Sequence, residues 1–235
     1  MKTDLIIAID VSTPEEILPI INSLPDEVSF YKVGLELFIS AGPMALIPFK
    51  DNNKKIFLDL KLHDIPRTVA RAVKSAAQHG VDILTVHAGG GSDMLKAAAE
   101  AAHECGENAP KLVAVTTLTS LNDDDLVEMG VTRGLSEHTL ALGKMAIDAG
   151  IDGLVCSPHE AAAFRELIGA EPILITPGIR PVGGDAGDQK RIATPAMAVA
   201  AGSSYLVVGR PILEADNPRE AAVAIIKEMQ SSEDI

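Results

Sequence analysis

Residues 57–68, Phe-Leu-Asp-Leu-Lys-Leu-His-Asp-Ile-Pro-Arg-Thr, bring two acids and one base close together. If this segment is a strand, side chains two positions apart point the same way, so Asp59 and Lys61 share one face while the alternating leucines anchor the other face in a core. Asp64 follows just beyond the expected strand end, where the chain turns before Pro66. Grouping charges in this way costs stability, and proteins often keep such groups where chemistry uses them. The spacing therefore suggests a catalytic centre.

The same spacing also fits a strand that carries an ordinary surface ion pair. Asp and Lys are mostly exposed in proteins, and such pairs are often purely structural. The segment alone does not separate the two interpretations, so the other features of the chain must be weighed with it.

The composition indicates one sizeable α/β domain. The chain has 235 residues, of which 47% are hydrophobic and only 3% aromatic, with a mean hydropathy of +0.20. A core must therefore be built from aliphatic side chains, which suits a sheet covered on both faces by helices. We expect a single domain over residues 1–235.

The charge and the cysteines limit the possible partners and compartment. A net charge of −13 argues against a nucleic-acid partner, although a locally cationic cleft could still bind an anionic small molecule. Cys105 and Cys156 are isolated thiols without metal-binding or redox spacing, and no basic apolar leader or run of transmembrane length is evident. We expect a cytoplasmic protein with no membrane partner.

Short aliphatic runs alternate with helix-like segments along the whole chain. The expected strands are 5–10, 30–34, 56–62, 83–88, 112–119, 153–158, 173–178 and 205–210, and clear helical segments lie at 68–78, 93–103, 135–149 and 195–201. Strands that alternate with helices pair in parallel, and this number of units predicts closure into a (β/α)8 TIM barrel. An open doubly wound sheet is the alternative, but no Gly-rich dinucleotide fingerprint follows the first strand.

Two connections after strand ends are longer than a simple unit needs. One is the Asp-rich segment 119–134, and the other is the Gly- and Pro-rich segment 179–191. Long loops in a compact barrel are usually functional lids or excursions. We expect the second, around 179–190, to close over a phosphate.

In such a barrel, polar side chains at the carboxyl ends of the strands form the active site. Besides the segment 57–68, the residues at these ends are Asp10, Lys32, His87, Thr119, Ser120, Pro177 and Arg210. The nearly alternating series Asp10, Lys32, Asp59, Lys61 and Asp64 predicts a row of paired charges in the barrel mouth.

Gly209 and Arg210 after the last strand are candidates for a phosphate site, which barrels often build from their last two loops. Glycine lets the backbone approach an anion, and arginine offers a bidentate fork. Arg180 and Gln189 in the preceding loop could close over the same group. Alternatively, Arg210 only caps its strand before Pro211.

The histidines and the metal chemistry carry weaker signals. A lone histidine at a strand end, such as His87, is more often a supporting hydrogen-bonded group than a catalyst, and His63 is expected to be structural. No cluster has metal-ligand spacing, so we predict no metal site.

The segment Leu58-Asp59-Leu60-Lys61-Leu62-His63-Asp64-Ile65-Pro66-Arg67-Thr68 closely resembles the active-site segment of the orotidine 5′-phosphate decarboxylase family. The similarity continues, in the family's order, through Ala8-Ile9-Asp10, Tyr31-Lys32-Val33-Gly34, Thr176-Pro177-Gly178-Ile179-Arg180, Asp188-Gln189-Lys190-Arg191 and Val208-Gly209-Arg210-Pro211-Ile212. Together these motifs span nearly the whole chain. The resemblance implies cofactor-free conversion of orotidine 5′-phosphate to UMP and carbon dioxide, the last step of pyrimidine biosynthesis.

The resemblance also implies a role for each matched residue. Lys61 is expected to protonate C6 of the pyrimidine, Asp59 to lie near the substrate carboxylate, and Lys32 to hold the charges in register. Asp64, with Ile65 and Thr68, is expected to enter the site of a partner subunit, because the family forms homodimers with shared active sites. The remaining expected contacts are Asp10 and Lys32 with the ribose, Thr119 or Ser120 with the base, Pro177 with the pocket, and Arg180, Gln189, Gly209 and Arg210 with the phosphate.

Two other functions fit parts of the same pattern. Magnesium-dependent sugar-phosphate decarboxylases and hexulose-phosphate aldolases of the same superfamily share the Asp-x-Lys-x-x-Asp array but carry an acidic metal ligand on the second strand, where this chain has Lys32. A non-catalytic nucleotide-binding barrel is expected to have lost one of Asp59, Lys61 or Asp64, and all are present.

Overall fold

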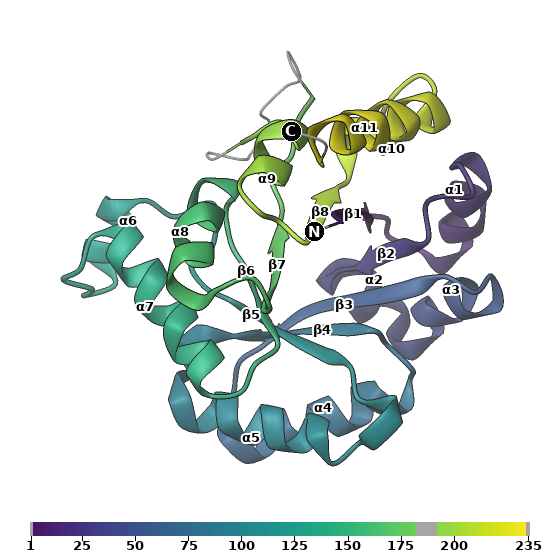
Figure 1. Cartoon of the computed structure of the whole chain (residues 1–235). Helices are drawn as coiled ribbons and strands as arrows, with labels where there is room; N and C mark the ends of the chain where they lie inside the picture. Colours follow the sequence, from purple (N-terminus) through teal and green to yellow (C-terminus); the bar gives the residue numbers. More distant parts are fainter. Residues whose placement is uncertain (1, 182–191, 234–235) are drawn as a thin grey trace.

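The computed structural model describes residues 2–181 and 192–233, and these form a closed parallel barrel whose strands follow one another in sequence order (Figure 1). The predicted (β/α)8 fold is confirmed. The strands are β1 (Asp4–Ile9), β2 (Phe30–Val33), β3 (Lys55–Leu62), β4 (Ile83–His87), β5 (Lys111–Val115), β6 (Gly153–Val155), β7 (Ile173–Thr176) and β8 (Tyr205–Val208).

Helices surround the barrel on the outside, as Figure 1 shows. The α-helices are α1 (Ile17–Ser23), α2 (Leu35–Ala41), α3 (Ile47–Asp51), α4 (Pro66–Gln78), α5 (Gly91–His103), α6 (Asp123–Glu128), α7 (Leu135–Asp148), α8 (Pro158–Ile168), α9 (Pro195–Ala200), α10 (Arg210–Leu213) and α11 (Pro218–Glu233). Short 3-10 helices are η1 (Pro14–Glu16), η2 (Gly42–Leu46), η3 (Ala88–Gly90) and η4 (Gly106–Asn108).

Several expected strand ends were wrong. The strands expected at 112–119 and 153–158 end early, at Val115 and Val155, and those expected at 173–178 and 205–210 end two residues early, at Thr176 and Val208. The residues after these ends belong to loops or to the following helix. The Asp-rich connection 119–134 contains α6, which Asn122 and Asp125 start by a reciprocal capping box.

Successive side chains along each strand point alternately into an inner and an outer core, and this alternation decides which residues reach the mouth of the barrel. An inner cluster of buried side chains contains Ile6 and Ala8 of β1, Phe30 of β2 and Phe57 of β3. The residues two places further along these strands take the same side. Asp10, Lys32 and Asp59 therefore stand above the inner apolar layer, at the carboxyl end of the barrel.

Strand β3 is irregular in its last half. Leu60 and Leu62 pack against the outer core, as expected, while Asp59 and Lys61 face the inside. The pairing with β4 shifts between Leu58 and Leu62, and Lys61 has a φ of 50°. The strand thus ends in a bulge that places a lysine in the left-handed region, which non-glycine residues seldom adopt.

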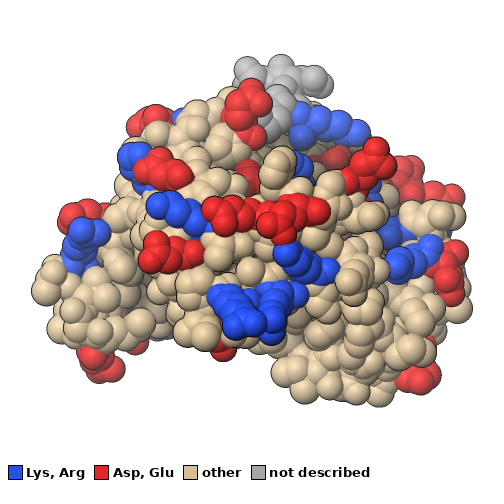
Figure 2. Space-filling model, turned by 90° about the horizontal axis from the view of Figure 1, so that it is seen from below, with Lys and Arg blue, Asp and Glu red and all other residues tan. Residues whose placement is uncertain are grey.

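The side of the molecule built from α4 and α5 carries both signs of charge (Figure 2). Acidic and basic side chains are interspersed there, and Lys74 of α4 pairs with Glu104 just after α5. No helix in the described part of the chain is both long and apolar enough to span a membrane.

Candidate active site

A cavity of about 260 Å³ opens at the carboxyl ends of the strands. Its floor is apolar and its walls carry polar and charged groups. The lining residues are Ala8, Asp10, Lys32, Phe57, Asp59, Lys61, Val115, Thr117, Leu118, Thr119, Val155, Cys156, Pro177, Gly178, Arg180, Val207, Gly209 and Arg210.

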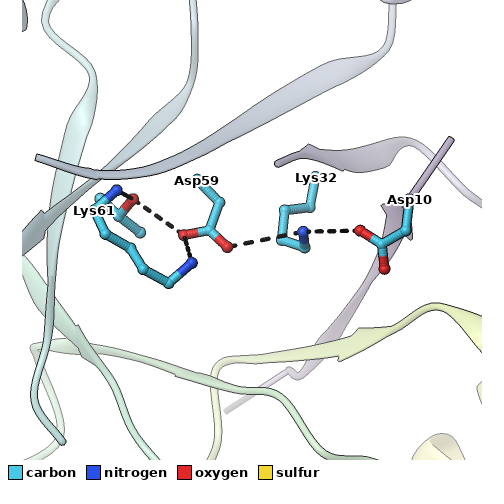
Figure 3. Close-up of polar contacts among 5 residues, drawn as sticks. Asp10, Lys32, Asp59 and Lys61 are labelled. Carbon is cyan, nitrogen blue, oxygen red and sulfur yellow. Dashed lines mark hydrogen bonds and ion pairs between the residues drawn. The ribbon is translucent and has the colours of Figure 1, made fainter. Parts of the chain in front are cut away.

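Four charges of alternating sign form a row along one wall of this cavity (Figure 3). Lys32 Nζ lies 3.4 Å from Asp10 Oδ1 and 3.7 Å from Asp59 Oδ2, so it bridges the two carboxylates. Lys61 Nζ lies 2.9 Å from the other oxygen of Asp59. We call Asp10, Lys32, Asp59 and Lys61 the charged row.

Burial is greatest at the centre of the charged row. The side chains of Lys32 and Asp59 are each 13% exposed, against 32% for Lys61 and 61% for Asp10. An ordinary surface ion pair does not describe Asp59 and Lys61, because both line the cavity and the largely buried Asp59 has two cationic partners.

Thr85 of β4, which was not predicted as a functional residue, supports the charged row from behind the cavity wall. Its hydroxyl donates to Asp59 Oδ1 at 3.1 Å and accepts the backbone N–H of Lys61 at 2.7 Å. The signal was weak, because one threonine in an aliphatic strand is ordinary and its contact depends on the bulge in β3. Two other residues that were not predicted, Thr117 and Cys156, line the cavity itself.

The opposite wall comes from β7, β8 and the loops after them. Pro177, Arg180, Gly209 and Arg210 all line the cavity, and the last three are residues predicted to bind a phosphate. Arg180 is only 8% exposed, and its guanidinium donates to the carbonyl of Ile179 at 2.9 Å. Its backbone N–H also bonds to the carbonyl of Ala193, 2.9 Å away. Gln189 and most of the expected closing loop, 179–190, lie outside the described residues.

The cavity is cationic although the chain is acidic. Its described lining holds the carboxylates of Asp10 and Asp59 and four cations, two lysines and two arginines, which gives a formal charge of +2. The rest of the chain carries the excess of acid. Such a focused positive field favours an anionic ligand.

The structure separates the remaining predicted residues. Thr119 lines the cavity, whereas Ser120 is exposed and lies outside it. Asp64, Ile65 and Thr68 are also exposed and do not reach the cavity of their own chain. Asp64 and Thr68 instead border a separate hollow next to Lys61.

His63 and His87 stack on each other beside the charged row, with ring centroids 5.1 Å apart. Nδ1 of His87 accepts the N–H of Gly89 at 3.1 Å. Burial, with the nearby His63 and Lys61, lowers the pKa of His87 below its ordinary value. Neither ring lines the cavity. In the described part of the chain, no three His, Cys, Asp or Glu side chains are grouped to hold a metal ion.

Comparison with known proteins shows the family to which this chain belongs. The model of the "Orotidine 5'-phosphate decarboxylase / HUMPS family" matches residues 3–225. The chain belongs to this family. The orotidine 5′-phosphate decarboxylase of Gloeothece citriformis is 47% identical over 96% of this chain and 97% of its own length. That of Rhodopseudomonas palustris is 50% identical over 96% of this chain and 94% of its own.

The solved structure of the family member from Lactobacillus acidophilus, an orotidine 5′-phosphate decarboxylase, superposes with a TM-score of 0.86 at 42% identity, covering 97% of this chain and 99% of that one. The family predicted from the motifs is therefore confirmed. The two structures superpose over nearly the full length of both chains.

Proposed function

We propose that the protein is an orotidine 5′-phosphate decarboxylase that forms UMP and carbon dioxide without a metal or an organic cofactor. The observation that carries this proposal is the Lys61–Asp59 pair, 2.9 Å apart in the wall of a cationic cavity. The curated relatives bearing this name cover the chain almost completely, which supports decarboxylation over the other activities of the superfamily.

The distribution of charge orients the substrate. The 5′-phosphate binds at the wall formed by Arg180, Gly209 and Arg210, with Gln189 as a further ligand. The ribose hydroxyls face Asp10 and Lys32, and the base lies between Thr119 and Pro177. This orientation places C6 of the pyrimidine and its carboxylate against Asp59 and Lys61.

The chemistry then follows from the charged row. The bond between C6 and the carboxylate breaks, carbon dioxide leaves, and the electron pair stays on C6 as a vinyl carbanion with no adjacent carbonyl to delocalise it. The ammonium of Lys61 stabilises this developing charge and donates a proton to C6, which yields UMP. Asp59 and Lys32 fix the ammonium before the reaction begins, and binding of the remote phosphate supplies energy for ordering the site.

A magnesium-dependent reaction of the same superfamily is the second candidate. Lys32 lies 3.7 Å from Asp59, where its cation would repel a divalent ion. Loss of orotidine 5′-phosphate absorbance, followed with and without EDTA, separates the two functions. We expect turnover that EDTA leaves unchanged. Turnover that EDTA abolishes and Mg²⁺ restores would contradict the proposal.

We also propose a homodimer in which Asp64, Ile65 and Thr68 complete the partner's site. Their exposure supports this role, since Ile65 is 68% exposed and Asp64 borders a hollow beside Lys61. Isologous dimers place such residues at both sites at once.

Mixing two inactive variants tests the shared site. In a Lys61→Ala/Asp64→Asn heterodimer, one site carries both defects and the other carries neither. Random exchange of subunits should thus restore up to about a quarter of wild-type turnover. Two copies of Lys61→Ala, mixed in the same way, provide the control. A mixture of the two different variants that stays inactive after exchange would refute sharing.

We place this dimer in the cytoplasm, with no membrane or nucleic-acid partner, as suits an enzyme of nucleotide synthesis. Fractionation of cells that express the protein checks this. Recovery in the membrane pellet would contradict it.

A further inference from the structure

Thr85 occupies a special position opposite the bulge at the end of β3. Leu58 pairs with Leu84 and Leu62 pairs with Val86, so residues 59–61 face the single residue Thr85. The threonine is fully buried, with 0% exposure. A bulge of this kind breaks the regular ladder and leaves backbone groups in need of other partners.

The hydroxyl of Thr85 supplies that partner and at the same time contacts the charged row. It accepts the backbone N–H of Lys61 at 2.7 Å, at the residue whose φ is 50°. The hydroxyl itself donates a hydrogen bond to Asp59 Oδ1 at 3.1 Å. Asp59 Oδ1 also accepts a hydrogen bond from Lys61 Nζ at 2.9 Å.

One hydroxyl thus connects the backbone of Lys61 to the carboxylate that orients its ammonium. The three groups form a small closed set of hydrogen bonds, which restrains both ends of the lysine side chain. Since strained backbone near active sites persists only where its surroundings hold it, the Thr85 contact is well placed to maintain the left-handed turn.

We infer that Thr85 is a positioning residue that sets where the Lys61 ammonium stands relative to C6 of the substrate. This inference rests on the proposed decarboxylation. Thr85 does not line the cavity, so it acts through Asp59 and Lys61 rather than on the substrate. Removing its hydroxyl should therefore lower turnover much more than it weakens nucleotide binding.

The test compares Thr85→Val, which keeps the shape and loses the hydroxyl, with Thr85→Ser, which keeps the hydroxyl. Misplacing a reacting group by about 1 Å can cost roughly 10²-fold in rate, so we expect kcat of Thr85→Val to fall about 10- to 100-fold. The dissociation constant for UMP should change far less, and Thr85→Ser should recover most of the rate.

Thr3→Val is the matched control. Thr3 is also buried, at 6% exposure, and its hydroxyl donates to the carbonyl of Ser203 at 2.9 Å, next to the amino-terminal end of β1. The Thr3→Val substitution should lower the melting temperature without changing kcat. Thr85→Val with wild-type kcat, or Thr85→Ser impaired as strongly as Thr85→Val, would overturn the inference.

Crystal structures of the wild type and Thr85→Val separate this inference from the proposed reaction. A shift of Lys61 out of the left-handed region, or rotation of Asp59 away from it, supports positioning even if the chain lacks decarboxylase activity. An unchanged Lys61–Asp59 pair would overturn it. Absence of turnover in the wild type would instead overturn the proposed function.

Discussion

The two ends of the barrel use the same residue types for different purposes. At the amino-terminal end, Asp82 accepts the backbone N–H of Ile56 at 2.8 Å, and Asp152 accepts that of Leu112 at 2.9 Å. Each carboxylate thereby holds the start of a neighbouring strand. At the carboxyl end, the contacts of Asp59 among the described residues are with the side chains of Lys32, Lys61 and Thr85.

The difference lies in the partners rather than in the charges. Lys111 and Asp152 form an ion pair of 2.7 Å, and Lys61 and Asp59 form one of 2.9 Å. The first pair is anchored to backbone and contributes to stability. The second lies in a cavity, satisfies little backbone, and holds a cation where the proposed reaction forms a carbanion. Ion-pair geometry alone therefore does not mark a catalytic lysine.

The sharpest contrast should come from Asp59→Asn and Asp152→Asn. We expect Asp59→Asn to lower kcat/KM by about 10²- to 10³-fold, because it removes the charge that orients Lys61. Its free energy of unfolding should fall as well, because Lys32 and Lys61 lose their shared carboxylate in a largely buried site, so the loss of activity is the quantity that separates the two variants. Steady-state kinetics and urea unfolding measure the two quantities. If Asp152→Asn lost activity to a similar extent, the comparison would fail.

Arg210→Ala should have the next largest effect, on binding. Losing a hydrogen bond to a charged group costs about 1.5–3 kcal/mol, so KM for orotidine 5′-phosphate should rise roughly 10- to 100-fold. Orotidine, which lacks the phosphate, serves as the control substrate. Its slow turnover should be equal in the variant and the wild type, and an equal loss with both substrates would place Arg210 elsewhere than at the phosphate.

Asp152→Ala should have the smallest effect on activity and a clear one on stability. It leaves the N–H of Leu112 without its carboxylate, and an unsatisfied buried donor costs about 1–3 kcal/mol. Urea unfolding measures that loss. At a temperature where the variant remains folded, kcat should stay within about twofold of wild type, since distant sites act independently. A large fall in kcat of Asp152→Ala with no loss of stability would contradict the structural role assigned to the amino-terminal end.

The sequence predicted the barrel and most of the charged row for one physical reason. Alternation along β1, β2 and β3 places Asp10, Lys32 and Asp59 inside, and parallel strands bring their carboxyl ends together. Neither step depends on details of packing.

The features that escaped prediction depend on local irregularity. The role of Thr85 arises from a bulge that no pattern in the strand announces. Strands β5 and β6 end where the ladder stops, and residue type does not mark that point after β5, because Thr116 and Thr117 are also typical of strands. Residue type could not separate Thr119 from Ser120, because only the loop geometry decides which of them lines the cavity.

One measurement tests the central claim most directly: turnover and UMP binding of Lys61→Ala beside Lys111→Ala. Both substitutions break an ion pair with an aspartate, at opposite ends of the barrel. We predict that Lys61→Ala loses about 10⁴-fold or more in kcat while still binding UMP, because acid and electrostatic stabilisation vanish together. Lys111→Ala should retain wild-type kcat. Substantial turnover by Lys61→Ala, or an equal loss in both variants, would contradict the account.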